Sequence, residues 1–287
     1  MSVVSLLNEV HVRPKGQLLK WIGNKYKFAE KIVSFFPKEY NKYIEPFLGT
    51  GAVLATLCPH QAIAADTLKP LIAIWDILQN EPDRLINHYH KNIIQFYRDR
   101  LETYNEIKLR YNSLPNGLDL MLLSRTCYGG VVRFTREGKM STPIGPHTPI
   151  TPESFEYRVM EWKERIQNVQ FLNQSFETTM QSAEQDDIIY CDPPYIDSQS
   201  ILYGAQNFKF DNLIHCIVEC KAKGAKIVLS IDGKKKSGEK KILINVPKTL
   251  FEREVYLDCG SSMLRRLQNG GRTMIGEDVD DRLLLTW

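Results

Sequence analysis

The sequence predicts an α/β fold with a largely parallel sheet, and three observations support this prediction. Short apolar segments typical of strands alternate with helical segments in the first and last parts of the 287-residue chain. A glycine-containing turn follows the first strand, as it does where a parallel sheet binds a ligand. A highly charged helical segment in the middle of the chain interrupts this alternation of strands and helices. We therefore expect one α/β domain made of residues 1–79 and 169–287, with helices on both faces of its sheet, and an inserted subdomain of residues 80–168.

The first third of the chain contains two strand–helix units. Residues 43–47 form a short strand that runs into the glycine turn Gly49-Thr50-Gly51, and a helix follows over 52–57. Residues 61–65 form a second apolar strand, which ends at Asp66, and another helix follows over about 69–79. Strand, turn, helix and strand in this order argue for parallel strands joined by helical crossovers.

The middle segment differs from the first third in pattern and composition. Residues 82–111 are helical and highly charged, and a short apolar helix follows at 118–124. The stretch 127–152 is rich in glycine and proline, and its prolines recur every third residue from Pro143 to Pro152, which predicts an extended surface loop. A helix returns at about 153–167. The insertion is therefore expected to be mainly helical with one long loop.

The strand pattern resumes after the insertion. Residues 169–172 and 187–191 are apolar strands, and the tetrapeptide Asp192-Pro193-Pro194-Tyr195 stands at the end of the second one. The remaining elements are a helix over 211–223, a buried strand over 226–231, and two segments at 251–257 and 282–287. We expect the last two segments to close the sheet as an antiparallel pair.

The composition is typical of a globular protein, with 43% hydrophobic and 25% charged residues. No run approaches the roughly 20 apolar residues of a membrane span, and the first residues do not resemble a signal peptide. The six cysteines lack the spacing of a zinc site, and Cys216 and Cys220 are spaced as one buried helix face. We expect a protein of the bacterial cytoplasm or nucleoid that binds no metal and no membrane.

Positive charge is concentrated at two places in a chain whose net charge is only +3. The first cluster contains Arg125, Arg133, Arg136 and Lys139. The second contains six lysines between Gly233 and Lys248, among them Lys234 and Lys235. Two local basic clusters in a nearly neutral chain predict contact with a polyanion at defined places, although each cluster alone would fit a solvated loop equally well.

The glycine turn after the first strand is a candidate ligand site. Gly49 and Gly51 let the backbone approach a ligand closely, and Asp66 ends the next strand, where an acid commonly binds ribose hydroxyls. The third glycine of a dinucleotide fingerprint is missing. On these residues alone, a nucleotide-dependent dehydrogenase and an ordinary tight turn beside a surface aspartate both remain open.

The motif from Asp192 to Tyr195 predicts a pocket for a planar amine. Its two prolines fix the backbone and remove two N–H donors, which leaves the Asp192 carboxylate and the Pro193 carbonyl as rigid acceptors, while Tyr195 adds an aromatic face for stacking. If both acceptors bind the amine hydrogens, the nitrogen lone pair is directed outward and the amine becomes nucleophilic through positioning and electrostatics. A proline-rigid loop with a buried tyrosine is the structural alternative.

Four motifs, taken in order, resemble the Dam-like (D12-class, α-type) DNA adenine-N6 methyltransferases. The motifs are LLKWIGNKY from Leu18, EPFLGTG from Glu45, Ala65-Asp66, and DPPY from Asp192, and the resemblance spans about residues 17–287. It implies a Rossmann-like S-adenosylmethionine-dependent methyltransferase sheet, with the insertion as a DNA-recognition subdomain. It also implies methyl transfer from S-adenosyl-L-methionine, which becomes S-adenosylhomocysteine, to N6 of an adenine flipped out of double-stranded DNA.

The resemblance assigns roles to individual residues. The catalytic residues that it implies are Asp192, Pro193, Pro194 and Tyr195. The cofactor site takes in Trp21, Lys25, Phe47, Gly49, Gly51, Asp66 and Asp192, with Asp66 at the ribose. Lys20 aligns with a DNA-contacting lysine. Without the resemblance, Trp21 would be taken as a core residue and Lys25 as a solvated charge.

The segment from Arg125 to Phe134, followed by Pro143, resembles the DNA-reading hairpin of the family. In that hairpin an aromatic residue wedges into the base stack and an arginine reads a guanine, and Tyr128 and Arg133 hold these positions. A core aromatic is the other interpretation of Tyr128. Family members often carry Asn where this chain has Gly129, so the target sequence stays open. Arg125, Arg136 and Lys139 are further DNA candidates, as are Lys234, Lys235 and Arg272 for phosphates.

The leading interpretation is a sequence-specific adenine methyltransferase that acts as a monomer, with restriction–modification as one setting. Methylation of cytosine N4 or of RNA is the alternative within the same chemistry, and Asp192 favours adenine because enzymes acting on cytosine N4 more often begin the motif with Ser. Cytosine C5 methylation is disfavoured, since no Pro-Cys nucleophile motif lies near the site. A DNA-binding protein without catalysis is the alternative from another class.

Overall fold

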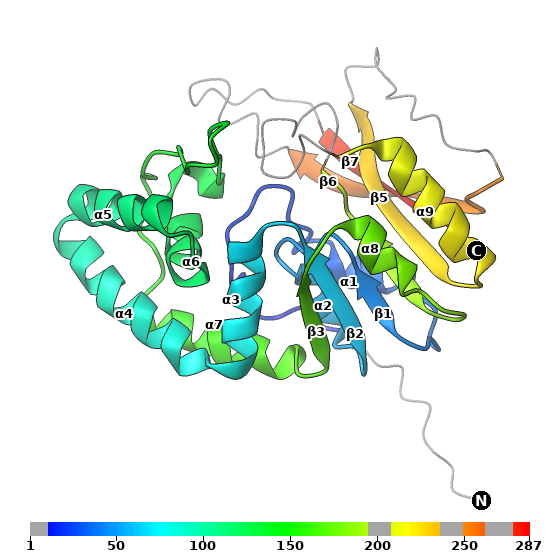
Figure 1. Ribbon diagram of the computed structural model, residues 1–287, viewed down its shortest axis with the longest axis horizontal. Helices are drawn as coiled ribbons and strands as arrows, with labels where there is room; N and C mark the ends of the chain where they lie inside the picture. Colours follow the sequence, from blue (N-terminus) through cyan, green and yellow to red (C-terminus); the bar gives the residue numbers. More distant parts are fainter. Residues whose placement is uncertain (1–10, 195–207, 236–248, 262–277) are drawn as a thin grey trace, which may run out of the picture.

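The protein is built around one seven-stranded sheet (Figure 1). The computed structural model describes residues 11–194, 208–235, 249–261 and 278–287. Along the sheet the strands are ordered β3-β2-β1-β4-β5-β7-β6. Their bounds are β1 Tyr43–Glu45, β2 Ala62–Asp66, β3 Val169–Asn173, β4 Ile188–Cys191, β5 Lys226–Lys235, β6 Arg253–Ser261 and β7 Asp278–Leu285.

The sheet combines parallel and antiparallel strands. Strands β1 to β5 pair in parallel, and β7 runs antiparallel between β5 and β6. This pairing confirms both the predicted α/β class and the predicted antiparallel pair. The strand order reverses between β1 and β4, because β2 and β3 lie on one side of this point and β5 lies on the other. The carboxyl ends of β1 and β4 therefore frame the crevice in which open α/β sheets bind ligands.

Helices cover both faces of the sheet. The first face packs against α1 (Ala29–Val33), α2 (Ala52–Leu57) and α3 (Lys69–Asn80), with α7 (Pro152–Arg165) packed on α2 and α3, and the second packs against α8 (Phe176–Gln181) and α9 (Phe210–Ala222). Because both faces are covered, the central strand β4 is buried and apolar along its whole length. In β4, Ile188 and Tyr190 belong to the core on the first face, whereas Ile189 and Cys191 belong to the core on the second.

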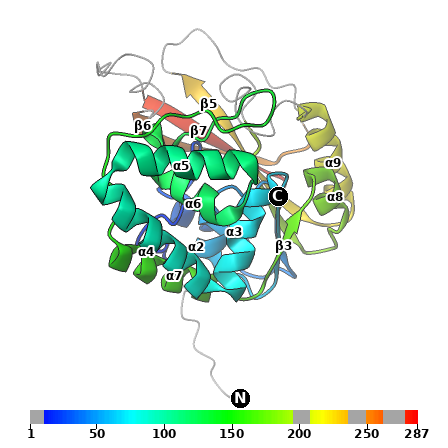
Figure 2. The same cartoon turned by 60° about the vertical axis from the view of Figure 1, so that its left-hand side comes forward.

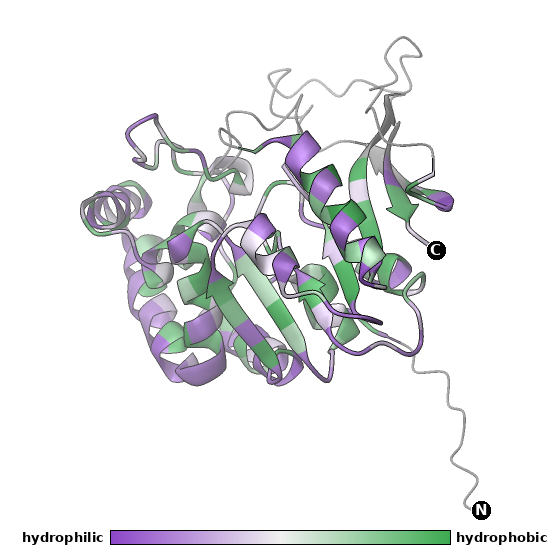
Figure 3. Cartoon of the chain, turned by 45° about the vertical axis from the view of Figure 1, so that its right-hand side comes forward, coloured by the Kyte–Doolittle hydropathy of each residue, from purple (hydrophilic) through white to green (hydrophobic). Residues whose placement is uncertain are grey.

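The middle of the chain adds helices at one side of the sheet. These are α4 (Pro82–Arg98), α5 (Arg100–Ser113), α6 (Gly117–Thr126) and a single 3-10 turn, η1 (Tyr128–Gly130). Figures 1 and 2 show α4 and α5 on the side remote from β5, and Figure 3 shows their outward faces as hydrophilic. Trp162 of α7 packs on Trp75 of α3, with ring centroids 5.8 Å apart. The hydrophobic core thus continues from the sheet into these helices.

Three local features differ from the sequence prediction. Helices α1 and α8 were not predicted, because five and six residues show no clear helical period and, unlike the equally short α2, neither helix follows a glycine turn after a strand. The helical stretch 82–111 is two helices, since Asp99 ends α4 and its carboxylate accepts the N–H of Glu102 to begin α5. Strand β5 runs on to Lys235, past the predicted end at Ile231.

The two cysteines of the predicted helix over 211–223 lie where their spacing places them. Cys216 and Cys220 lie on the buried face of α9, which confirms the prediction from their spacing. Across the described ranges, no helix is long and apolar enough to cross a membrane. The same ranges contain no group of three or more His, Cys, Asp or Glu side chains arranged to hold a metal ion.

Candidate active site

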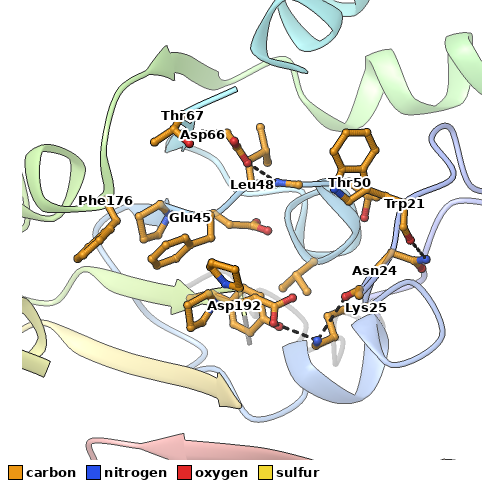
Figure 4. A pocket seen from close by; sticks show the side chains of 18 of the residues that line it. Trp21, Asn24, Lys25, Glu45, Leu48, Thr50, Asp66, Thr67, Phe176 and Asp192 are labelled. Atoms are coloured by element: carbon orange, nitrogen blue, oxygen red, sulfur yellow. Dashed lines mark hydrogen bonds and ion pairs between the residues drawn. The ribbon is translucent and has the colours of Figure 1, made fainter. Parts of the chain in front are cut away.

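A cavity of about 350 Å³ opens at the carboxyl ends of β1 and β4, where the strand order reverses (Figure 4). Its volume is in the range of small-molecule sites. The cavity walls bring together most of the predicted cofactor and catalytic residues, namely Trp21, Lys25, Phe47, Gly49, Asp66, Asp192, Pro193 and Pro194. Residues that the sequence did not single out also line it, among them Glu45, Thr50, Phe176 and Phe208.

The turn after β1 is tied to the end of β2 through Asp66. The backbone N–H of Gly49 donates to Oδ2 of Asp66 at 3.2 Å, and the N–H of Leu68 donates to Oδ1 at 3.0 Å. Gly49 has φ of +49°, and a Cβ at this position would meet no other atom within 4 Å. The backbone at Gly49 therefore faces open space in the cavity, beside a carboxylate that two N–H donors hold in place.

Gly51 lies where the local backbone and packing require a glycine. It precedes α2 with φ of +56°, and a Cβ would lie 3.1 Å from Cη2 of Trp75. Gly51 is absent from the described residues that line the cavity. The left-handed backbone and the close packing of Trp75 are sufficient to require glycine here, and the predicted ligand contact of Gly51 stays a prediction.

Three phenylalanines form an aromatic wall at one end of the cavity. Phe47 stacks on Phe176 of α8 with ring centroids 5.2 Å apart, and the ring of Phe208 meets Phe47 edge-on at 5.9 Å. Phe47 follows β1, so the sequence pattern placed it in the cofactor site, whereas Phe176 and Phe208 lie more than a hundred residues away. Such a wall suits the face of a flat heterocycle.

Asp192 directly follows β4, and its side chain is 18% exposed at the cavity wall. Its Oδ1 lies 3.0 Å from Nζ of Lys25, which approaches from the segment before α1 (Figure 4). Lys25 also lies 3.4 Å from Oδ2 of Asp281 in β7. The structure therefore joins a predicted catalytic residue to a predicted cofactor residue, and it adds Asp281, for which the sequence offers no local signal.

Glu45, the last residue of β1, is a second carboxyl group at the cavity wall and is only 2% exposed. The hydroxyl of Tyr43 donates to Oε2 of Glu45 at 2.7 Å. Burial raises the pKa of Glu45 from its usual 4.5 to about 8, the Tyr43 hydrogen bond opposes this rise, and the Asp192 charge adds to it. Glu45 is therefore largely protonated at neutral pH in the ligand-free protein.

Trp21 and Lys25 are carried by one short turn. The side-chain amide of Asn24 donates to the carbonyl of Trp21 at 2.8 Å, and the amide of Gln17 donates to Oδ1 of Asn24 at 3.0 Å. Trp21 is 6% exposed, belongs to the hydrophobic core and still lines the cavity. The core interpretation of Trp21 and its predicted place at the cofactor site are therefore compatible.

The segment from Cys127 to Gly145 folds back on itself. The N–H of Tyr128 donates to the Pro143 carbonyl at 2.8 Å, and the N–H of Ser141 donates to the Arg133 carbonyl at 2.9 Å. Tyr128 is 44% exposed, so the interpretation as a core aromatic is wrong. The exposed basic side chains of this hairpin are Arg133, Arg136 and Lys139, and the Lys139 ammonium donates to the Asn112 carbonyl.

Arg125 differs from these three because its guanidinium turns inward. Nη1 donates to the carbonyls of Gln17 and Leu18 at 3.0 and 2.7 Å, and burial lowers the pKa of Arg125 to about 10. The side chain of Arg125 therefore supports the segment that carries Lys20, and its predicted DNA contact stays a prediction. A Cβ on Gly130 would lie 2.8 Å from Cβ of Lys20, so the hairpin packs directly against the exposed Lys20.

Four predicted side chains lie outside the part of the chain that the structure describes. They are those of Tyr195, Lys234, Lys235 and Arg272. The backbone of Lys234 and Lys235 belongs to β5. The stacking role of Tyr195 and the phosphate contacts of the three basic residues stay predictions.

Comparisons with known proteins agree with this geometry. The chain is 25% identical over 238 residues to the Type II methyltransferase M1.LlaDCHI of Lactococcus lactis subsp. cremoris, which covers 78% of this chain and 82% of that protein. It is 29% identical over 189 residues to a DNA adenine methylase of Vibrio cholerae, covering 64% and 66%. It is also 29% identical over 198 residues to the Type II methyltransferase M.MjaIII of Methanocaldococcus jannaschii, covering 62% and 68%.

The family model of the D12 class N6 adenine-specific DNA methyltransferases matches residues 21–266. The match begins at Trp21 and includes the glycine turn, Asp66 and Asp192. A family with this activity implies DNA as the substrate and a methyl donor of the S-adenosylmethionine type. The chain therefore belongs to the D12 class N6 adenine-specific DNA methyltransferases and is an adenine-specific DNA methyltransferase.

Proposed function

We propose that this protein transfers a methyl group from S-adenosyl-L-methionine to N6 of an adenine in duplex DNA, with Asp192 as the residue that binds the target amine. The observation that carries the proposal is the place of Asp192. It stands at the carboxyl end of β4, in the wall of a cavity that also contains Gly49 and Asp66. One cavity thus offers an acceptor for the amine and a separate place for the methyl donor.

The residues present fit an adenosyl cofactor. The aromatic wall of Phe47, Phe176 and Phe208 suits the adenine ring, and the Asp66 carboxylate at the end of β2 suits the ribose hydroxyls. The open space beside Gly49 is where a side chain would otherwise obstruct the ligand. When bound, S-adenosylmethionine supplies an electrophilic methyl group on a positively charged sulfur.

Positioning of the amine is the part of catalysis that we assign to this chain. An exocyclic amine is a weak nucleophile because its lone pair is delocalised into the ring. The Asp192 carboxylate and the Pro193 carbonyl accept the amine hydrogens and turn the lone pair toward the methyl group, and the cavity walls exclude water. An amine inside a duplex cannot reach the end of β4, so the base must be flipped out, and Tyr195 would stack on it.

The exposed hairpin supports recognition of a defined DNA sequence. We propose that Tyr128 occupies the space left in the base stack and that Arg133 reads a guanine, while Lys20, Arg136 and Lys139 contact the DNA backbone.

We further propose that residues 80–168 form the target-recognition subdomain and that the protein acts as a monomer in the bacterial cytoplasm. Relatives named Type II methyltransferases make restriction–modification one setting for it.

Transfer of a labelled methyl group to duplex DNA tests the role of Asp192. The Asp192→Ala protein should fold, yet at saturating donor it should lose transfer by a factor of about 100 or more, because the amine loses a positioned acceptor. Asp83→Ala removes an exposed aspartate of α4 and is the matched control with wild-type transfer. Near-normal transfer by Asp192→Ala would contradict the proposal.

A further inference from the structure

We infer that Asp281, on the last strand of the sheet, is a positioning residue for methyl transfer that acts on Asp192 through Lys25. This inference rests on the proposed role of Asp192. Asp281 lies in β7, far in sequence from both partners, and its side chain is only 12% exposed. No motif of the chain includes it.

The Lys25 ammonium has three hydrogens to donate, and the described residues place three acceptors beside it. Nζ lies 3.0 Å from Oδ1 of Asp192, 3.4 Å from Oδ2 of Asp281 and 3.3 Å from the carbonyl of Gly23. The Lys25 side chain is only 5% exposed, so protein groups hold its ammonium more than water does. Lys25 lies in the cavity wall and, through this ion pair, also holds the Asp192 carboxylate in position.

The sheet explains why Asp281 can reach this site. Side chains alternate between the two faces of a strand, and Asp281 points to the same face as Leu283, which packs in the core with Tyr190 of β4. Asp192 follows Tyr190 by two residues and so points to that face as well. The carboxylates of Asp192 and Asp281 therefore lie on the same face of the sheet, and both contact the ammonium of Lys25.

Two carboxylates that share one ammonium leave the group with a net negative charge. Lys25 therefore neutralises the Asp192 carboxylate less completely than it would if Asp192 were its sole carboxylate partner. Asp192 thus remains a strong acceptor for the amine hydrogens. Neutralising Asp281 lets the ammonium shift toward Asp192. The carboxylate then becomes a weaker and differently oriented acceptor, although the donor site around Asp66 is unchanged.

The test is a double-mutant cycle on the full chain, measured as the single-turnover rate of methyl transfer to duplex DNA with saturating donor. Asp281→Asn, which keeps the shape of the side chain, should lower this rate about tenfold, which corresponds to about 1.4 kcal/mol. Lys25→Met should lower it further. Because Asp281 acts through Lys25, the double variant should be within about twofold of Lys25→Met alone.

Three further measurements separate positioning from a merely structural role. The dissociation constant for S-adenosylmethionine and the thermal midpoint of Asp281→Asn should stay close to the wild-type values. Glu254→Gln removes an exposed carboxylate from the adjacent strand β6 and should leave the rate unchanged. A wild-type rate in Asp281→Asn, multiplicative effects in the double variant, or a loss confined to the amount of folded protein would each overturn the inference.

The outcome for Asp192 distinguishes the two proposals. If Asp192→Ala is inactive while Asp281→Asn transfers methyl groups at the wild-type rate, only the role of Asp281 fails. If Asp192→Ala is itself active, the proposed function fails, and the cycle on Lys25 and Asp281 loses its basis.

Discussion

The carboxylate of Asp66 accepts the N–H of Gly49 at 3.2 Å, so the end of β2 fixes the turn that follows β1. Asp66 is 6% exposed and also accepts the N–H of Leu68 at 3.0 Å. One side chain thereby shapes two backbone segments of the cavity and presents its charge to a ligand. Asp66 therefore holds the scaffold of the cavity, and in the proposed function its carboxylate also contacts the methyl donor.

Asp66→Ala is expected to weaken binding of S-adenosylmethionine by roughly tenfold to a hundredfold, because charge-assisted hydrogen bonds of about 1.5–3 kcal/mol are lost. Titration calorimetry of the ligand-free variant measures this effect, and thermal unfolding shows whether the scaffold survives. Asp211→Ala, at an exposed site in the first turn of α9, is the matched control. An unchanged affinity in Asp66→Ala would remove Asp66 from the donor site.

Gly51→Ala is expected to destabilise the ligand-free protein by about 1–3 kcal/mol, since the left-handed backbone is strained and the new Cβ meets the Trp75 ring. Urea denaturation measures the free energy of unfolding. Gly49→Ala shares the strained backbone but not the clash, and its methyl group enters the cavity. Gly49→Ala should therefore weaken donor binding more than Gly51→Ala does, and the reverse order would contradict these assignments.

Glu45 is expected to make the stability of the ligand-free protein fall as the pH rises. Its folded-state pKa of about 8 exceeds the usual 4.5, so between these values the unfolded chain releases a proton that the folded protein retains. Fewer protons on the unfolded state mean that the free energy of unfolding decreases with pH in this window and levels off above about 8.

Glu45→Gln removes this titration and should gain stability relative to the wild type as the pH is raised from about 5 to 8. The comparison of the two proteins by urea denaturation at each pH cancels the other titrating groups. A stability difference that stays constant across this range would show that Glu45 ionises at an ordinary pKa.

Arg133→Ala is expected to relax discrimination at one base pair of the target by about 1–3 kcal/mol, because a bidentate contact to guanine is lost. Methylation rates on a set of duplexes with single substitutions measure this effect. Arg136→Ala, in the same exposed hairpin, should weaken binding to all duplexes alike if it contacts phosphate. Unchanged discrimination at every position in Arg133→Ala would assign the reading of guanine to another residue.

Features that depend on neighbouring residues could be predicted from the sequence. The strand that ends at Asp66, the turn at Gly49 and the position of Asp192 after a buried strand follow from local apolar runs and turn residues, and parallel strands place their carboxyl ends at one edge of the sheet. The antiparallel pair of β6 and β7 also follows from two late apolar segments.

Features that depend on distant parts of the chain could not be predicted. Phe176 and Phe208 reach Phe47 only through the packing of α8 and the segment before α9, and Asp281 reaches Lys25 only through the register of β7. The direction of the Arg125 guanidinium has the same origin. A basic residue beside other basic residues suggests a DNA contact, whereas the buried carbonyls of Gln17 and Leu18, over a hundred residues away, determine where it points.

The most direct test of the central claim is the identity of the nucleoside that the wild-type protein methylates. Duplex DNA incubated with the protein and labelled S-adenosylmethionine is digested to nucleosides, which are separated by chromatography. We predict that the label appears in N6-methyladenine and that Asp192→Ala lowers this label by a factor of about 100 or more. Label in N4-methylcytosine, or transfer to RNA with no transfer to duplex DNA, would contradict the account.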